Sequence, residues 1–483
     1  MESDRPFTLA NILRIEDCTD LTDALCPETQ MPLWAIVRVA FLRTVIEEKL
    51  YTGSFQTLLL GGGRSRRVSL LASLVRGAWH NRLHRRFLAG RNDVLVVSKG
   101  LRLLKDGGRY FNALSDYFNR LTDASVLNVE ELHCGVWPFP RSESQRYLIA
   151  DPYLFSAKAV GRLGHRRQRE RSTELMHLAA DRLEQFTGMR LTAAAIDGLA
   201  RILARGAASL PFAREGALGL LTRAAPSLIL KEEACYGGVE NLALISAARE
   251  RKIRTAEYQH GMISKGHYAY NYSGGIIASG RFAGLLPDFF LGFGRWWNRQ
   301  INVPVDKIAI GYPHREEILR RLPQQGGSDV LVLGDGIDTD MTLRFARDLG
   351  GQLDGRLRVV FRPHPIERQR TRDIMGAGEY QRISADFSAD IYTSFAKSYA
   401  VIGEVSTGLF EAAGIVSNVF VWSTPKTRFS FPSHPFVQIG TASEVVAKLN
   451  DSYPSSNVSA IRDLWEEGWE VNYRAFVASI LGN

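Results

Sequence analysis

The sequence predicts an α/β protein of two Rossmann-like domains, each with a mainly parallel sheet and helices on its faces. Short runs of β-forming residues alternate with helical stretches along most of the chain, as in repeated strand–helix–strand units. The chain has 483 residues, which is too many for a single hydrophobic core. A stretch rich in Gln, Gly and Ser at 324–328 separates two such series, so the domain boundary is expected near 310–328.

The first domain is expected to cover residues 1–312 and to begin with helices. Pro32 stands where a helix would start, and a broad apolar face follows it. Buried strands are predicted at 93–98 and 125–129, with a helix at 111–121 between them. These elements open a strand–helix–strand series.

A helical region rich in Arg and Ala interrupts this series at about 145–222. Its apolar residues recur at helical spacing, and we interpret it as an insertion in the first domain. The alternation then resumes with strands at 227–230, 253–258, 276–277, 289–291 and 308–310, and with helices at 239–251 and near 295–300.

The second domain, expected at 313–457, repeats the alternation. Its predicted strands lie at 330–333, 358–361, 399–402 and 419–422. The last segment, 458–483, is predicted to form a helix with one strongly apolar face, which consists of Ile461, Trp465, Trp469, Tyr473, Phe476 and Ile480. A helix this apolar has to dock on the protein, and we expect it to cross back to the first domain.

The composition predicts a cytosolic protein. Hydrophobic residues make up 45% of the chain and charged residues 23%, as in soluble globular proteins. No apolar run approaches the roughly 20 residues that a membrane-spanning helix needs. The first residues include Glu2 and Asp4 and have no apolar core, so they do not read as a signal peptide.

The net charge of +9 is concentrated in arginine-rich clusters. They are Arg64, Arg66 and Arg67; Arg82, His84, Arg85 and Arg86; and Arg162, Arg166, Arg167, Arg169 and Arg171. Such clusters attract anionic lipid or acidic polysaccharide, although each one can also be simply a solvated helix face. No zinc-finger, helix-turn-helix or aromatic RNA-binding signature accompanies them, so nucleic acid is not an expected partner. Between 70 and 87 apolar and basic residues alternate at helical spacing, which suits either a membrane surface or packing on the protein.

Two turns in the second domain have the residues of a phosphate site. The first, from Arg362 to Pro365, follows a strand and holds His364 between two prolines. The second, Ser406-Thr407-Gly408, follows another strand and opens a helix, whose first N–H groups, hydroxyls and dipole suit a phosphate. Because ligands of open α/β sheets bind at the carboxyl ends of strands, both turns can face one nucleotide. Either turn alone is better explained as an ordinary connection between a strand and a helix, and only together, with a third turn upstream, do they favour a site.

Acidic residues near the second turn are candidates for binding a ribose. Glu404 precedes Ser406, and Glu411 lies on the helix that follows. A carboxylate suits paired hydroxyls, and we expect Glu411 to make that contact. The alternative is that Glu411 only complements the helix dipole.

A third turn, in the first domain, provides a candidate general base. His260 and Gly261 follow the strand that carries Glu257. A histidine at a strand end, facing a cleft between domains, can take a proton near neutral pH, and Glu257 is the second choice for this role. The alternative is that His260 only supports the loop after it, which contains His267 and several tyrosines.

The order of several motifs resembles bacterial glycosyltransferases of surface polysaccharides, which have the GT-B fold. The motifs are KEEACYGG, AARERKIRTAEYQHGMISKGHYAY, PDFFLGFGRWW, IAIGYP, FRPHP and GEVSTGLFEA, within residues 227–425. The chain looks most like the enzymes of capsule and lipopolysaccharide assembly that use CMP-activated nonulosonic acids or Kdo. It is more distantly similar to CDP-glycerol polymer synthases. The fold implied is α/β of the GT-B type, with two facing Rossmann-like domains and a helical insertion in the first.

This resemblance implies an inverting, metal-independent transferase. In sialyltransferase-like members a His-Pro motif and a Ser/Thr pair hold the CMP phosphate, which correspond here to His364-Pro365 and Ser406-Thr407. The glycerol-polymer relatives favour His260, which precedes a glycine, as the base. No cofactor is implied; the partners would be a nucleotide-sugar donor and a glycan or lipid-linked acceptor near the inner membrane. Two alternatives stay open: a CDP-glycerol or ribitol type polyol-phosphate transferase, and a non-catalytic protein that binds nucleotide or polysaccharide.

Overall fold

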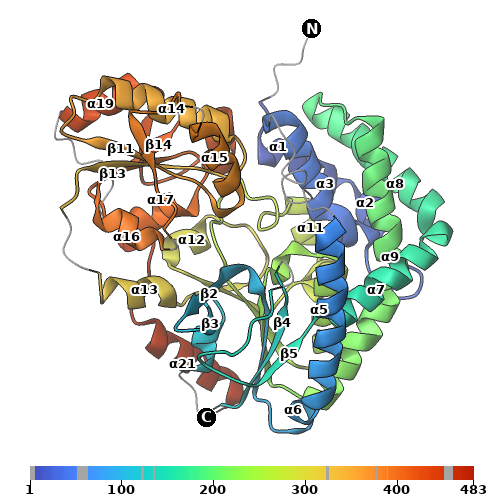
Figure 1. Ribbon diagram of the computed structural model, residues 1–483. Helices are drawn as coiled ribbons and strands as arrows, with labels where there is room; N and C mark the ends of the chain where they lie inside the picture. The colour runs from blue at the N-terminus through green and yellow to red at the C-terminus, as the bar shows by residue number, and fades with distance from the viewer. Residues whose placement is uncertain are drawn as a thin grey trace.

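The computed structural model contains two parallel sheets that belong to two successive parts of the chain (Figure 1). It describes residues 6–51, 64–120, 124–133, 136–322, 326–376, 378–388, 390–450 and 461–482. The α/β prediction, with two Rossmann-like domains and a helical insertion in the first, is confirmed.

The sheet of the first domain has seven parallel strands in the order β5-β4-β1-β6-β7-β8-β9. They are β1 (Val94–Lys99), β4 (Val126–Glu131), β5 (Tyr147–Ile149), β6 (Leu228–Glu232), β7 (Arg254–Tyr258), β8 (Phe289–Gly292) and β9 (Asp306–Ala309). The central strands β1, β6 and β7 are mostly buried, because helices cover both faces of a parallel sheet, and the last residues of β6 and β7 include buried charged side chains.

Helices on the flank of the first domain include the insertion. They are α3 (Leu33–Leu50), α5 (Arg64–Leu83), α7 (Asp151–Gly164), α8 (Arg169–Thr187), α9 (Ala193–Ala224) and α10 (Gly238–Glu250). Figure 1 shows α7, α8 and α9 side by side at the right of the molecule, and α9 contacts α3, α7, α8 and α10. The region that was expected to be helical from about 145 therefore begins with the short edge strand β5, and its helices run from 151 to 224.

The sheet of the second domain has six parallel strands in the order β12-β11-β10-β13-β14-β15. They are β10 (Asp329–Leu333), β11 (Arg358–Arg362), β12 (Ile383–Ala385), β13 (Ser398–Gly403), β14 (Asn418–Trp422) and β15 (Val437–Ile439). The helices around this sheet are α13 (Pro313–Leu319), α14 (Thr339–Gln352), α15 (Arg368–Met375), α16 (Ile391–Ala396), α17 (Thr407–Ala412), α18 (Pro425–Ser430) and α19 (Ala442–Asn450).

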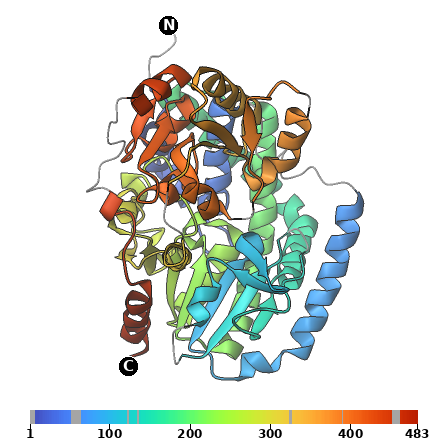
Figure 2. The ribbon, with the colours of Figure 1, turned by 60° about the vertical axis from the view of Figure 1, so that its left-hand side comes forward.

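The last helix, α21 (Trp469–Leu481), packs on the first domain. The Tyr473 hydroxyl donates to the Phe118 carbonyl oxygen at 3.3 Å, and Phe476 lies edge-on against Phe289. Figure 2 shows this helix at the lower left, below the second domain. Of the segment predicted to be one helix from 458, residues 458–460 lie outside the described residues. The prediction is wrong at 463–468, which form turns before α21 begins, with Gly468 at φ +71°.

Two further secondary-structure predictions are wrong. The helix expected at 111–121 is replaced by strand β3 (Arg109–Asn112), which pairs with β2 (Leu103–Asp106), and by a short 3-10 helix at Asp116–Asn119. The strand expected at 276–277 is instead part of helix α11 (Gly274–Ser279), because Ser273 caps its first turn by accepting from the Ile276 N–H. Two adjacent β-branched residues are too short a pattern to separate strand from helix.

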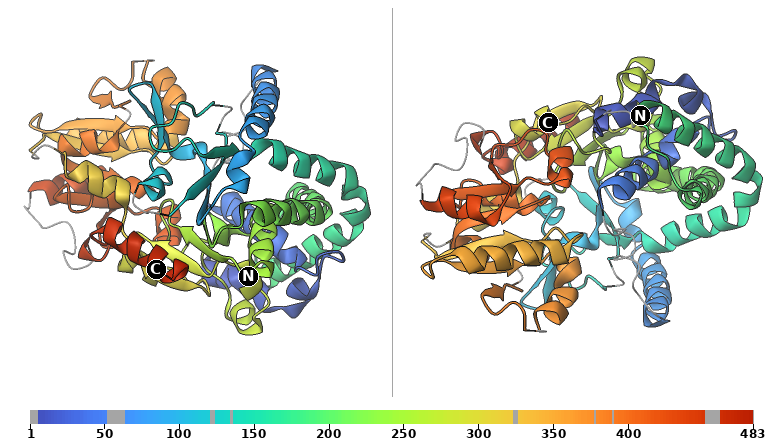
Figure 3. Two further views of the ribbon diagram at one scale, coloured as in Figure 1. Left: turned by 90° about the horizontal axis from the view of Figure 1, so that it is seen from below. Right: turned by 90° about the horizontal axis from the view of Figure 1, so that it is seen from above.

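The two domains touch along loops at the carboxyl ends of their strands. Trp296 and Trp297, in α12 (Arg295–Arg299), pack against Phe410 of the second domain. The Ser264 hydroxyl donates to the Ser430 carbonyl oxygen across the same junction. Figure 3 shows the molecule from below and from above, with the second domain beside the first. Within the described part of the chain, no helix is long and apolar enough to cross a membrane.

Candidate functional site: a basic cleft between the domains

A cleft of about 1130 Å³ lies between the two domains. Its first-domain wall comes from the ends of β1 and β6 and from α3, α7, α9 and α10, and its second-domain wall from the turn after β11. The turn contributes His364, Pro365 and Ile366. A cleft of this volume suits a small-molecule ligand.

Positive charge dominates the cleft. Its basic residues are Arg43, Lys99, Arg102, Lys158, Arg162, Arg205 and Lys231, whereas its acidic residues are Glu233 and Glu240. A concave surface with walls of low dielectric constant focuses this potential. The cleft is therefore suited to an anion, and most of its charge comes from the first domain.

His364 faces this cleft from the second domain. Its Nδ1 accepts a hydrogen bond from the Ile366 N–H at 3.4 Å, so the neutral ring carries its proton on Nε2. Burial, together with the positive charges of Arg102 and Arg368, lowers the pKa of His364. Gly336 has φ of +79°, and a Cβ there would lie 2.8 Å from Nδ1, so a glycine is needed for the ring to occupy this place.

Most of the other residues predicted in the two second-domain turns form hydrogen bonds with groups of the protein itself. Arg362 is buried, and its guanidinium donates to Asp386 at 2.8 Å and to the hydroxyls and carbonyl of nearby serines. Ser406 caps α17 by accepting from the Gly408 N–H at 3.1 Å. The Thr407 Oγ1 accepts from the Met262 N–H at 3.2 Å, which joins the two domains. The start of this six-residue helix is therefore against the first domain.

Glu404 belongs to a buried ion cluster. The Lys426 ammonium lies 2.7 Å from Glu404 and 2.9 Å from Asp335, and all three side chains are almost fully buried. Burial raises the pKa of Glu404 to about 6, despite the opposing effect of Lys426. Thr424 donates a further hydrogen bond to the same carboxylate.

Glu411 and Gly408 of α17 are buried too. Burial raises the pKa of Glu411, and the positive charges of Arg102 and Arg315 oppose the rise. A Cβ on Gly408 would lie 2.9 Å from Leu333 Cδ1, so this glycine allows close packing of α17 on the sheet.

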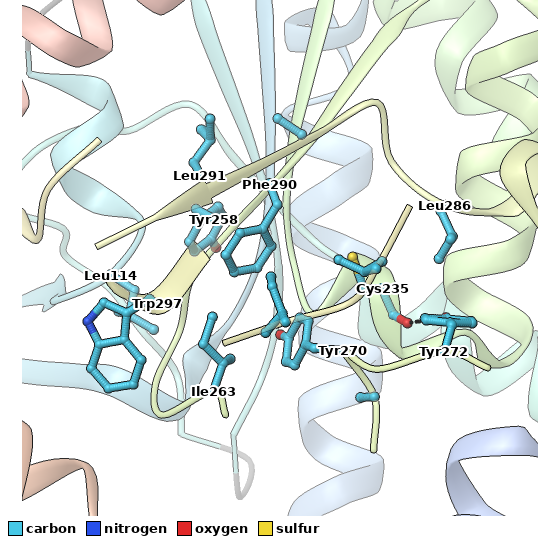
Figure 4. Close-up of a cluster of buried hydrophobic side chains, with 14 of the residues drawn as sticks. Leu114, Cys235, Tyr258, Ile263, Tyr270, Tyr272, Leu286, Phe290, Leu291 and Trp297 are labelled. Carbon is cyan, nitrogen blue, oxygen red and sulfur yellow. Dashed lines mark hydrogen bonds between the residues drawn. The ribbon is translucent and has the colours of Figure 1, made fainter. Parts of the chain in front are cut away.

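A chain of hydrogen bonds orients His260 at the end of β7. Glu257, within the strand, is completely buried and accepts from the Cys235 N–H at 2.6 Å and from the Tyr270 hydroxyl. Because Tyr270 donates its proton to Glu257, its oxygen is left to accept from Nδ1 of His260, 3.3 Å away. Figure 4 shows Tyr270 among the apolar core residues of this region. The arrangement leaves Nε2 of His260 as the nitrogen that can accept a proton.

Glu233 lies on the other side of the His260 ring. Its Oε1 is 3.8 Å from Nε2 of His260, and its Oε2 pairs with Lys99. Burial would raise the pKa of Glu233, but the nearby His260 and Lys99 outweigh it and lower the pKa to about 2. Burial lowers the pKa of His260 to about 4, although Glu233 opposes this change, so the ring is neutral at pH 7. Glu257 has its pKa raised to about 7 by burial and lies behind the histidine rather than in the cleft.

His267 and Tyr236 complete the aromatic layer around His260. His267 Nδ1 accepts from the Ala269 N–H at 3.3 Å, so its Nε2 donates to the Tyr236 hydroxyl at 3.2 Å. Burial lowers the pKa of His267 to about 3, with a smaller effect from His260. Both rings pack edge-on against Tyr236, which lines the cleft.

Sequence reasoning missed most of the charged residues of the cleft, including Lys231, Glu233 and Arg102. Glu233 and Lys231 belong to the KEEACYGG motif, so their place at the end of β6 was a usable signal. Lys231 is buried, and this desolvation, with the nearby Lys99, lowers its pKa. Arg102 follows β1, and its charge acts on both His260 and His364. Nothing in the sequence around Arg102 indicates that it would line the cleft. Among the described residues, no group of three or more His, Cys, Asp or Glu side chains could hold a metal ion.

The chain was compared with known proteins. No family model and no curated protein matches it. Among solved structures, it is similar to UDP-GlcNAc 2-epimerase from Neisseria meningitidis bound to UDP-GlcNAc (11% identity, 81% of this chain, 100% of the other, TM-score 0.40). It is also similar to the wall teichoic acid polymerase TagF (10%, 86% and 92%, TM-score 0.36) and to the glycosyltransferase VinC in complex with dTDP (10%, 80% and 98%, TM-score 0.40). The structure itself has two parallel sheets with a cleft at the carboxyl ends of their strands, which is the arrangement expected of two facing Rossmann-like domains.

Proposed function

We propose that this chain is an inverting glycosyltransferase that moves a sugar from a nucleotide donor to an acceptor hydroxyl without a metal ion. The observation that carries the proposal is a neutral histidine, His260, which Tyr270 orients and whose Nε2 lies 3.8 Å from Glu233, a residue that lines a strongly basic cleft. His364 presents its Nε2–H from the opposite domain. A base and an anion site on facing walls are what direct displacement at a sugar carbon requires.

In the proposed reaction, His260 accepts a proton from the acceptor, and groups on both walls bind the departing phosphate. The acceptor hydroxyl gives its proton to Nε2 of His260, and its oxygen forms a bond to the anomeric carbon. The bond from that carbon to the donor phosphate oxygen breaks, and the electron pair leaves with the phosphate. Glu233, 3.8 Å from Nε2, stabilises the imidazolium that forms. His364 and Arg102 supply positive or hydrogen-bonding groups for the departing phosphate.

The donor in this proposal is a CMP-activated nonulosonic acid or Kdo. Such a donor carries a carboxylate on the sugar in addition to the phosphate, and the cleft has seven basic residues against two acidic ones. A neutral sugar would leave more of this charge without a partner. The acceptor is a surface glycan or a lipid-linked precursor, which places the enzyme at the inner membrane face as a peripheral protein.

The decisive experiment supplies CMP-Kdo, CMP-sialic acid, CDP-glycerol and UDP-GlcNAc separately and measures nucleotide release with and without glycan acceptors. We expect release from a CMP-sugar, dependent on acceptor. Release from CDP-glycerol instead would make the chain a polyol-phosphate transferase. Binding of CMP without release from any donor, by folded protein, would contradict an enzymatic role.

A further inference from the structure

Helix α5 carries a row of apolar side chains on the outside of the molecule. Leu71, Val75, Trp79 and Leu83 follow one another at intervals of four residues, and their exposed fractions are 64%, 67%, 61% and 59%. Four residues advance an α-helix by slightly more than one turn, so the four side chains form one stripe about 18 Å long. Figure 2 shows α5 along an outer edge of the first domain.

The face of α5 that contacts the protein has small and polar side chains, whereas an ordinary surface helix turns its apolar side chains toward the protein. A Cβ on Gly77 would lie 3.0 Å from Ile149 Cγ2, so the helix approaches β5 closely at that point. Asn81 exchanges two hydrogen bonds of 2.8 Å with the Ile149 backbone, and the His80 ring bonds the Tyr147 carbonyl at 3.0 Å. These bonds fix the rotation of the helix with its apolar stripe outward.

The chain segment that contains the stripe has only basic formal charges. The sequence has no Asp or Glu between Glu48 and Asp93, and in this stretch it has eight arginines. Those with exposed side chains among the described residues include Arg76, Arg82, Arg85 and Arg86. An apolar row bordered by arginines, with a Trp among them, complements a layer of acyl chains beneath anionic headgroups.

We propose that α5 is a docking surface for an anionic lipid membrane. The stripe would enter the boundary between headgroups and acyl chains, and the arginines would bind lipid phosphates. Helix α7, which contacts α5, contributes Lys158 and Arg162 to the cleft, so docking through α5 holds the cleft near the lipid surface. This matches the lipid-linked acceptor of the proposed function, although the evidence for docking does not depend on catalysis.

The experiment measures co-sedimentation of the full chain with vesicles of phosphatidylcholine mixed with phosphatidylglycerol, and with vesicles of phosphatidylcholine alone. We expect binding to the mixed vesicles that weakens as salt is added. The double variant Val75→Gln/Trp79→Gln should reduce the partition coefficient by about tenfold or more, because it removes two of the apolar anchors. Arg85→Gln/Arg86→Gln should reduce binding to the mixed vesicles only.

Matched controls come from other surfaces. Val471, on α21, is 71% exposed, close to the value for Val75, so Val471→Gln should leave binding unchanged. Arg356→Gln, in the second domain, is the control for charge. Each variant is checked by circular dichroism and by its molar mass in solution.

Three results would overturn the proposal. The first is equal binding to both kinds of vesicle, and the second is a loss of vesicle binding from Val471→Gln as large as that from Val75→Gln/Trp79→Gln. The third is a wild-type oligomer that Val75→Gln/Trp79→Gln dissociates in the absence of lipid. The last result would instead make α5 an interface between copies of this chain. His260→Ala should bind vesicles normally, so failure of the proposed catalysis and failure of docking are observed separately.

Discussion

The two walls of the cleft use their polar residues differently. In the first domain, a buried network from Glu257 through Tyr270 ends at His260, which lies beside Glu233 of the cleft. In the second domain, Arg362 and Glu404 have their partners within the domain, and the predicted residues His364 and Pro365 line the cleft. In the proposed function, this contrast assigns the chemistry to the first wall, and a rigid frame with one anion contact to the second wall.

Replacing His260 tests the first wall and should have the largest effect. His260→Ala is expected to reduce transfer by about 100- to 10,000-fold, the usual loss for a missing general base. Nucleotide affinity should stay near that of the wild type, because His260 does not contact the donor phosphate in our proposal. Steady-state rates and calorimetry of CMP binding measure the two quantities. Loss of CMP affinity, with turnover preserved at saturating donor, would move His260 to the donor site.

The ion cluster of the second wall should matter for stability. Lys426→Met leaves Asp335 and Glu404 buried without their cation, and should lower the free energy of unfolding by about 3–5 kcal/mol. Lys397→Met, at an exposed position in the same domain, should change it by less than about 0.5 kcal/mol. Urea titration followed by circular dichroism gives both values. Equal effects from the two variants would show that the cluster is not a structural frame.

His364 should affect donor binding more than chemistry. We expect His364→Ala to weaken CMP binding by about 1–3 kcal/mol, the range for a hydrogen bond to a charged group. Thermal shift or calorimetry with CMP measures the loss. Unchanged affinity in a folded variant would show that the second wall has no phosphate contact at this position.

The pH profile compares His260 with and without Glu233. The pKa of His260 is lowered to about 4, so kcat/KM in the wild type should fall as pH decreases through about 4 rather than through the ordinary value of about 6.5. Glu233 favours the protonated ring. Glu233→Gln should therefore lower the pKa further, move the acidic limb to lower pH and slow transfer by about tenfold.

Lys99→Gln is a control for this experiment, because it alters the same ion pair but leaves the carboxylate next to His260. Its loss of positive charge should move the acidic limb to higher pH, which is the opposite direction. Identical shifts in both variants would contradict the electrostatic explanation.

The sequence by itself was enough to predict the α/β class, the two domains and most central strands. These features depend on local periodicity and on β-forming runs such as Val359-Val360-Phe361, which are visible within a few residues. The positions of His260 and His364 after strand ends were also predictable, since each follows a clear strand and parallel strands place their carboxyl ends at one edge of a sheet. The short edge strands β5, β12 and β15 were not, because three residues carry almost no pattern.

Only the tertiary structure decided what each polar residue does. Ser406 and Thr407 read as phosphate ligands, but Thr407 accepts from Met262, 145 residues away in the sequence, and no local pattern encodes that contact. Glu233 and His260 likewise meet because β6 and β7 are neighbours in the sheet. The orientation of α5 is the clearest case. Its sequence allowed its apolar residues to face the protein or the solvent, and the bonds of Asn81 and the close approach at Gly77 turned them outward.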